Sequence, residues 1–131
     1  MDENGAEPGP RIQSGLFDHE RLDVYQAAIR FIEWRSGILR RLPSNHHLVD
    51  QLDRASTSIA LNIAEGSGEW SRPERSRFYR MARRSATECA AVLDVVEARR
   101  IEPKERMAEG KELIHRVIAM LTALARANRA L

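Results

Sequence analysis

Residues 50–88, DQLDRASTSIALNIAEGSGEWSRPERSRFYRMARRSATE, decide the fold. The stretch contains the end of one helical pattern, a short turn and the start of a second helical pattern. The turn is Gly66-Ser67-Gly68, because glycine readily adopts the left-handed conformation that ends helices. Small residues in the first pattern let a second helix approach closely. The stretch therefore predicts a helical hairpin, a building unit of all-α proteins.

The flanking sequence extends this hairpin to an all-α, up-down-up-down antiparallel four-helix bundle. Pro43, Pro73 and Pro103 interrupt the chain at regular intervals, and short connections make successive helices antiparallel neighbours. Residues 1–16 are acidic, lack a hydrophobic segment and are expected to be a disordered tail. The bundle then occupies 17–131. Its helices are predicted at about 19–41, 45–66, 72–100 and 103–129.

Apolar spacing assigns an inward face to each of the last three helices. Ser44 or Asn45 is expected to cap the helix over 45–66, and Ser71 with Glu74 forms a capping box for the next helix. The inward positions are Leu48, Leu52, Ser56, Ile59 and Ile63, then Phe78, Ala82, Ser85, Cys89, Val92 and Val96, then Ile114, Val117, Leu121, Leu124 and Asn128.

The first predicted helix is apolar on two sides. One face is formed by Leu22, Tyr25, Ile29, Ile32 and Leu39, and the other by Val24, Ala28, Phe31, Trp34 and Ile38. A helix that is apolar on two sides has to be covered twice. We therefore expect its own bundle to cover one face and a second copy of the chain to cover the other.

Composition limits the remaining possibilities. The single cysteine, Cys89, excludes an internal disulfide and a cysteine zinc cluster, and its apolar neighbours predict a small buried residue. No apolar run reaches the roughly 18–20 residues that span a bilayer, so we expect no membrane association and a cytoplasmic location. Net charge is only +2, which by itself indicates no class of partner.

A local cluster of positive charge is more informative than the net charge. Between Trp70 and Arg84 the only acidic residue is Glu74, against six arginines: Arg72, Arg75, Arg77, Arg80, Arg83 and Arg84. Guanidinium groups pair with phosphate oxygens, and Trp70 with Tyr79 offers surface on which unpaired bases stack. The alternative is a solvated helix face that forms ion pairs with the acidic residues of the last helix, Glu102, Glu105, Glu109 and Glu112.

Two other groups could carry chemistry. The first consists of Arg54, Asn62, Glu65, Ser85 and Glu88. It is interpreted as an inward polar network that fixes helix register, with a general acid/base pair as the alternative. The second is Glu112-Leu113-Ile114-His115, one E-x-x-H motif of the kind that holds iron in helical bundles. The second motif that such a centre needs is missing, so no metal and no cofactor are predicted.

Several segments resemble a known family. They are Leu22–Ala28, Gln51–Ile59, Asn62–Gly66 and Phe78–Glu88, and together they resemble the "four helix bundle protein" family. Its members are also called rRNA intervening-sequence proteins, and their fold is similar to that of the accessory variability proteins of diversity-generating retroelements. The resemblance covers about residues 17–125.

The resemblance implies a cytosolic, non-enzymatic bundle that often assembles as a ring-like homopentamer. In the retroelement relatives, a basic surface engages nucleic acid and a reverse transcriptase. From the residues and the resemblance together, we expect a non-enzymatic, oligomeric accessory protein that binds RNA or DNA through its arginine-rich face. The alternative is a protein–protein interaction scaffold with no nucleic-acid role.

Overall fold

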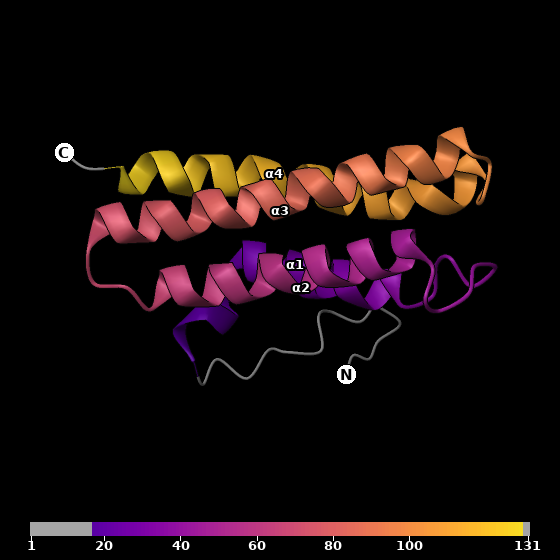
Figure 1. The fold of residues 1–131 in the computed structure, drawn as a ribbon. Helices are drawn as coiled ribbons and strands as arrows, with labels where there is room; N and C mark the ends of the chain where they lie inside the picture. Colours follow the sequence, from indigo (N-terminus) through magenta and orange to yellow (C-terminus); the bar gives the residue numbers. More distant parts are fainter. Residues whose placement is uncertain (1–16, 130–131) are drawn as a thin grey trace, which may run out of the picture.

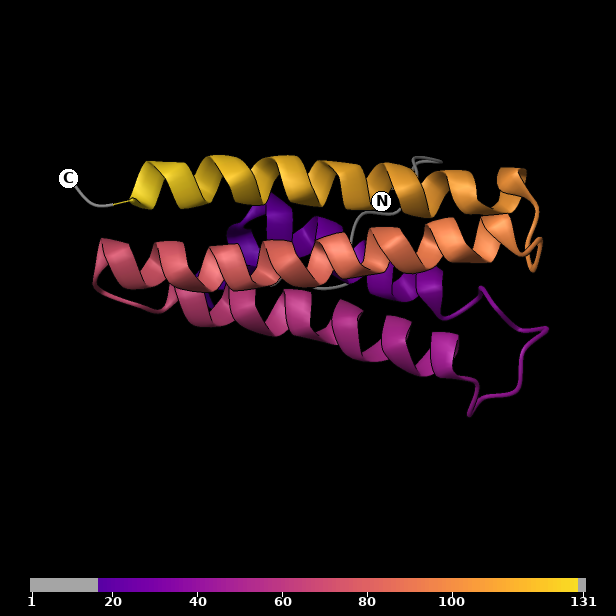
Figure 2. The same ribbon diagram turned by 45° about the horizontal axis from the view of Figure 1, so that its top comes forward.

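The computed structural model describes residues 17–129. Within that range, four α-helices follow a short 3₁₀ helix over Asp18–Arg21. They are α1 (Asp23–Arg35), α2 (His47–Ser67), α3 (Arg72–Ala98) and α4 (Lys104–Asn128). Each helix packs against the next, and α1 also packs against α4, which closes the bundle (Figures 1 and 2). The all-α four-helix bundle is therefore confirmed. The predicted tail over 1–16 lies outside the described residues.

The inward face of α2 agrees fully with the apolar spacing. Leu48, Leu52, Ser56, Ile59 and Ile63 are all buried. Burial of each large aliphatic side chain contributes roughly 1.5–3 kcal/mol, so this row is a major source of stability. The predicted N-terminal cap of α2, Ser44 or Asn45, is wrong.

His46 caps α2, in place of Ser44 or Asn45. Its Nδ1 accepts a hydrogen bond from the backbone N–H of Leu48 at 3.1 Å. The imidazole nitrogen supplies the acceptor that a serine or asparagine oxygen normally supplies at this position. At α3 the predicted cap is present, because Ser71 Oγ accepts from the Glu74 N–H at 3.3 Å.

The inward faces of α3 and α4 are rotated slightly from the predicted ones. On α3, Tyr79 and Ala86 are buried, while Phe78 and Ser85 are only half-buried. On α4, Ala125 is buried, and Leu124 and Asn128 stay half-buried. The remaining predicted positions are buried, including Cys89, which has no exposed surface. Burial raises the pKa of the Cys89 thiol to about 12, with a smaller contribution from the nearby Glu88 carboxylate.

The first helix is shorter than predicted, because α1 spans Asp23–Arg35 and not 19–41. Leu22 is extended between the 3₁₀ helix and α1. After Arg35 the chain turns, and Leu39 adopts a left-handed backbone with φ of 65°. Ile38 and Leu39 nevertheless lie in the core, with 8% and 4% of their surface exposed. The chain therefore continues to bury the apolar pattern after it has left the helix.

The bundle covers one of the two apolar faces of α1. Val24, Ala28 and Phe31 are almost completely buried, and Trp34 packs partly against the same core. The Trp34 ring lies against Gly110 of α4, where a Cβ atom would come within 2.2 Å of the ring edge. The bundle therefore covers this face, while Tyr25, Ile29 and Ile32 of the other face stay half-buried, so cover of that face by a second chain stays a prediction. Over residues 17–129, no helix combines the length and hydrophobicity that a membrane crossing requires.

Candidate functional site

The six arginines Arg72, Arg75, Arg77, Arg80, Arg83 and Arg84 form what we call the arginine surface. They lie on the first half of α3, beside the last turns of α4 and the α2–α3 turn (Figure 1). Contacts between the helices fix this position. The Arg72 guanidinium donates to the Ala127 carbonyl, and Ser76 Oγ donates to the Ala125 carbonyl at 2.9 Å. The antiparallel packing thus brings the start of α3 to the end of α4.

The arginine surface is mostly not neutralised by carboxylates. Arg75 Nε donates to the Glu69 carbonyl at 2.6 Å, and Arg80 Nη1 donates to Ser76 Oγ at 2.8 Å. Within residues 17–129, Arg77 is the one member that forms an ion pair, with Glu74 at 3.2 Å. Neutral oxygens orient a guanidinium without cancelling its charge. A field of positive charge therefore remains at this end of the bundle.

The alternative pairing with α4 acids is not what the structure shows. Glu102, Glu105, Glu109 and Glu112 lie in the first half of α4 or just before it, which packs against the last half of α3. There the ion pairs are Lys111 with Asp94 at 3.0 Å and with Glu97 at 3.1 Å. The hydrogen bond to Asp94 raises the pKa of Lys111. The antiparallel packing of α3 and α4 therefore places the arginines at the start of α3 and the acidic residues at the start of α4 at opposite ends of the bundle.

Two further arginines extend the basic end. Arg126 and Arg129 of the α4 C-terminus lie opposite Arg80 and Arg83 of α3 across a cleft of about 250 Å³. We call this the arginine cleft; it is lined by Ser76, Arg80, Arg83, Thr122, Arg126 and Arg129. The sequence reading missed Arg126 and Arg129, because they are more than forty positions from Arg83. Antiparallel pairing of α3 with α4 indicates them, because it places the end of α4 beside the start of α3.

Of the two aromatic residues expected to stack on bases, only Trp70 is available. Its side chain is 94% exposed in the α2–α3 turn. Tyr79 is only 3% exposed, and burial raises the pKa of its hydroxyl. It packs so close to Gly66 that a Cβ atom there would lie 3.0 Å from the ring. The interpretation of Tyr79 as a stacking surface is therefore wrong.

The predicted polar network is smaller than expected. Asn62 Nδ2 donates to the Ser58 carbonyl at 2.9 Å, and Ser85 Oγ donates to Ser58 Oγ at 2.9 Å. Ser58, absent from the prediction, thus joins α2 to α3. Glu88 borders the same shallow hollow of about 370 Å³. The other two members point elsewhere.

Arg54 and Glu65 do not take part in this group. Arg54 is exposed and forms an i,i+4 ion pair with Asp50 at 3.1 Å, and Glu65 is exposed near the end of α2. An inward position for Arg54 is therefore wrong. What remains is a hydroxyl and amide contact between two helices, which suits a role in helix register.

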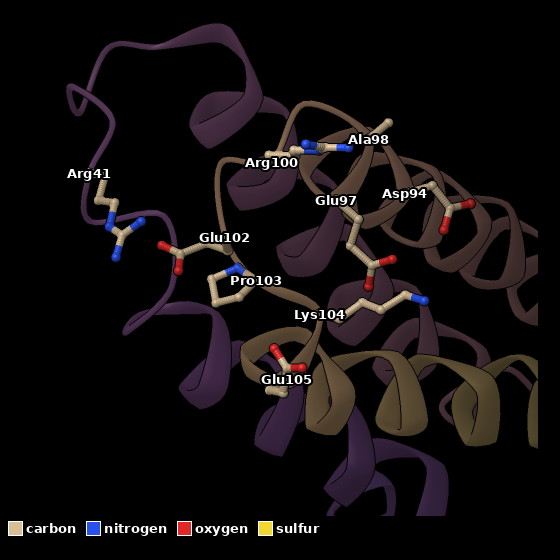
Figure 3. A pocket seen from close by; sticks show the side chains of 9 residues that line it. All are labelled: Arg41, Asp94, Glu97, Ala98, Arg100, Glu102, Pro103, Lys104 and Glu105. Carbon is tan, nitrogen blue, oxygen red and sulfur yellow. The ribbon is translucent and has the colours of Figure 1, made fainter.

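Another cleft, with a volume of about 810 Å³, lies at the opposite end of the bundle. Figure 3 shows acidic and basic side chains interspersed around it, including Arg41, Glu102 and Lys104. Glu102 is 3% exposed, and Arg106 Nε lies 2.8 Å from its Oε1. Mixed charges of this kind neutralise one another. The residues that line the cleft therefore carry no excess of positive charge that would attract an anion such as nucleic acid.

The E-x-x-H motif lies on the outside of α4. Both Glu112 and His115 are exposed. In the part of the chain that the structure describes, no three histidine, cysteine, aspartate or glutamate side chains gather in a group that could hold a metal ion.

Fold and surface together define a class: an α-helical bundle with a strongly basic end, in which α3 and α4 supply the arginines. The sequence profile described as "23S rRNA-intervening sequence protein" matches residues 20–123. The chain belongs to this family. None of the curated proteins matches it.

A solved structure shares the fold. It is described as a protein of unknown function from the S23 ribosomal protein family of Bacteroides thetaiotaomicron. The similarity has a TM-score of 0.72 and covers 79% of this chain and 98% of the other, at 17% sequence identity. At that identity, the similarity concerns the fold alone.

Proposed function

We propose that this chain is a non-enzymatic, cytoplasmic accessory protein that binds RNA or DNA through the arginine surface. The proposal rests on one observation: carboxylates do not neutralise most of the arginines of this surface. Of six neighbouring arginines, Arg77 alone forms an ion pair within residues 17–129, and Arg84 forms neither an ion pair nor a hydrogen bond there. Positive charge of this density attracts polyanions, and binding is strengthened by release of the counterions condensed on them.

The chemistry of the surface favours the sugar-phosphate backbone over base edges. Planar guanidinium groups donate paired hydrogen bonds to phosphate oxygens, and phosphate contacts position a nucleic acid without selecting a sequence. Trp70, near Arg75 through the contact of Arg75 with the Glu69 carbonyl, adds a stacking surface for an unpaired base. We therefore propose binding with little sequence preference and an advantage for single strands.

A charge-removal experiment tests this proposal. The triple variant Arg77→Ala, Arg80→Ala, Arg84→Ala removes three charges from the surface and no buried side chain. Each lost phosphate contact lowers the slope of log K against log salt by about 0.7–0.9. We expect weaker binding to every sequence and a slope smaller by about 2–3.

The matched control is Arg40→Ala, Arg41→Ala, Arg99→Ala, which removes three exposed charges from the opposite end of the bundle. It lowers net charge equally, so it should keep most of the affinity and of the salt slope. If the affinity of the Arg77→Ala, Arg80→Ala, Arg84→Ala variant is unchanged, or if both variants lose affinity equally, the arginine surface is not the binding site.

We further propose that the chain acts as a homo-oligomer, with the pentamer as the expected form. Support comes from Ile29 and Ile32 on α1, which stay half-exposed, and from Leu61 on α2, which is 61% exposed. Exposed apolar side chains favour contacts between copies. Multi-angle light scattering at micromolar concentration should return a multiple of the chain mass of 14.9 kDa; a monomer mass would contradict the oligomer.

Exposed apolar residues also favour one alternative, a protein–protein interaction scaffold. Leu61 and Trp70 are large apolar side chains directed to solvent, of the kind enriched at interfaces. The partner would be a reverse transcriptase or another protein. Stoichiometric capture of one protein that survives nuclease treatment and is lost in Leu61→Asp would favour this alternative over nucleic-acid binding.

A further inference from the structure

The arginine cleft differs from the rest of the arginine surface because it is concave and shared by two helices. Arg80 and Arg83 of α3 face Arg126 and Arg129 at the end of α4 across about 250 Å³. No carboxylate lines the cleft among the residues that the structure describes. Four positive charges thus converge on one small volume.

Two hydroxyl groups organise this cleft. Ser76, 1% exposed, donates from Oγ to the Ala125 carbonyl at 2.9 Å and accepts from Arg80 Nη1 at 2.8 Å. Thr122 Oγ1 donates to the Ile118 carbonyl at 2.8 Å and lies 3.5 Å from Arg83 Nη1. Each of these guanidinium groups has five N–H donors, so most donors remain for a ligand. Side chains already held in place lose less entropy when a ligand binds.

Size and charge select the kind of ligand. A volume of about 250 Å³ is smaller than the roughly 300–1,000 Å³ of pockets for drug-sized molecules, so the cleft accommodates one small group. A terminal phosphate monoester carries about −1.5 to −2 charges at neutral pH and presents three acceptor oxygens. A phosphodiester within a strand carries one charge and continues in both directions. The monoester therefore matches four convergent guanidinium groups better.

We propose that the arginine cleft binds the terminal phosphate monoester of a nucleic-acid strand. The inference deepens the proposed function and rests on it for the choice of a strand end over a free mononucleotide. Arg80 and Arg83 belong both to the cleft and to the arginine surface, so the two are continuous. A strand whose end enters the cleft can extend along that surface, where Arg77 and Arg84 are exposed to contact its next phosphates.

The test compares short single strands of one sequence that differ only at their ends. Strands with a 5′ phosphate, a 3′ phosphate or two hydroxyl ends are titrated into the full-length chain at near-physiological salt. We expect one phosphorylated end to increase affinity at least tenfold. In Arg83→Gln, Arg126→Gln the preference should fall to about one, and Arg83→Lys should retain part of it because lysine keeps the charge and loses the planar fork.

The control variant is Arg77→Gln, Arg84→Gln, which should weaken all strands and keep the preference, because neither residue lines the cleft. Circular dichroism checks folding, and the exposed single substitution Arg126→Gln replaces the double variant if that variant fails to fold. Equal affinity for phosphorylated and hydroxyl ends would overturn the inference and leave the proposed function standing.

Failure of the proposed function gives a different result. If no strand binds but adenosine monophosphate or inorganic phosphate raises the melting temperature of the wild type, and not that of Arg83→Gln, Arg126→Gln, the cleft binds free phosphate compounds. That outcome would overturn the strand end as the ligand. No effect of any phosphate compound, free or at a strand end, would overturn the cleft as a phosphate site.

Discussion

Gly110→Ala tests the packing of α1 against α4, because helix propensity and packing predict opposite results. By propensity alone, alanine inside a helix is about 1 kcal/mol more favourable than glycine. In the bundle, the new Cβ atom would lie 2.2 Å from Trp34 Cη2 and 2.3 Å from Cζ3. Ordinary contacts begin at 3.4 Å, so the ring edge has to retreat by about 1 Å.

The retreat of Trp34 has two costs. Overpacking of a core costs about 1–3 kcal/mol. Movement of the ring also disturbs its tilted contact with Phe31, whose ring centroid lies 5.5 Å away, and such pairs contribute about 0.5–1.5 kcal/mol. After subtracting the propensity gain, we expect Gly110→Ala to lower the free energy of unfolding by about 1–3 kcal/mol.

Urea denaturation measures this change, with Gly37→Ala as the matched control. At Gly37 an added Cβ would have its nearest contacts at 3.8 Å, so this variant should be neutral or stabilised by about 0.4–1 kcal/mol. In a double-mutant cycle, Trp34→Leu should remove most of the cost of Gly110→Ala. A Gly110→Ala protein at least as stable as the wild type would show that the Trp34 ring leaves room for a side chain at position 110.

Other predictions follow from individual contacts. Arg106→Gln leaves the buried Glu102 carboxylate without its cation and should lower the free energy of unfolding, measured with urea, by about 1–3 kcal/mol. Arg54→Gln breaks an exposed ion pair and should lower it by less than about 0.5 kcal/mol. Equal losses in the two variants would contradict this. The Cys89 thiol should react with a disulfide reagent at pH 8 only after denaturation, and stoichiometric labelling of the native protein would refute its burial. The pKa of Lys111 in the folded protein is raised above its usual 10.5, so the stabilisation from its ion pairs is complete below pH 10.5 and is lost as the pH rises through the folded pKa. The melting temperatures of the wild type and Lys111→Gln should therefore converge in strong alkali. A difference that stays constant with pH would contradict this.

The sequence predicts the bundle well where spacing and chain breaks agree. All five inward positions of α2 are buried, because its small and aliphatic residues recur at steps of three and four with no competing apolar face. On α3, the adjacent aromatic residues Phe78 and Tyr79 fit two different inward faces, and the spacing of apolar residues does not show which of the two faces the core. Spacing also predicts the wrong end for α1, because Ile38 and Leu39 fit the helical pattern but are buried by a loop in which Leu39 is left-handed.

The candidate site was predictable only within one helix. The arginine surface is visible in the sequence because its six members all lie within residues 72–84 of α3. The arginine cleft is not, since Arg126 and Arg129 reach it only through the register of α3 against α4. Likewise, the acidic residues of α4 could have neutralised the arginines, and only the antiparallel packing places them at the other end.

Binding of nucleic acid by the arginine surface is the function proposed for this chain. The most direct measurement is a fluorescence titration of nuclease-treated protein with short single-stranded and duplex RNA and DNA, at low and near-physiological salt. We predict binding that weakens steeply with salt and persists at physiological salt, because several phosphate contacts release counterions together. Absence of binding to all four ligands at low salt would contradict the account.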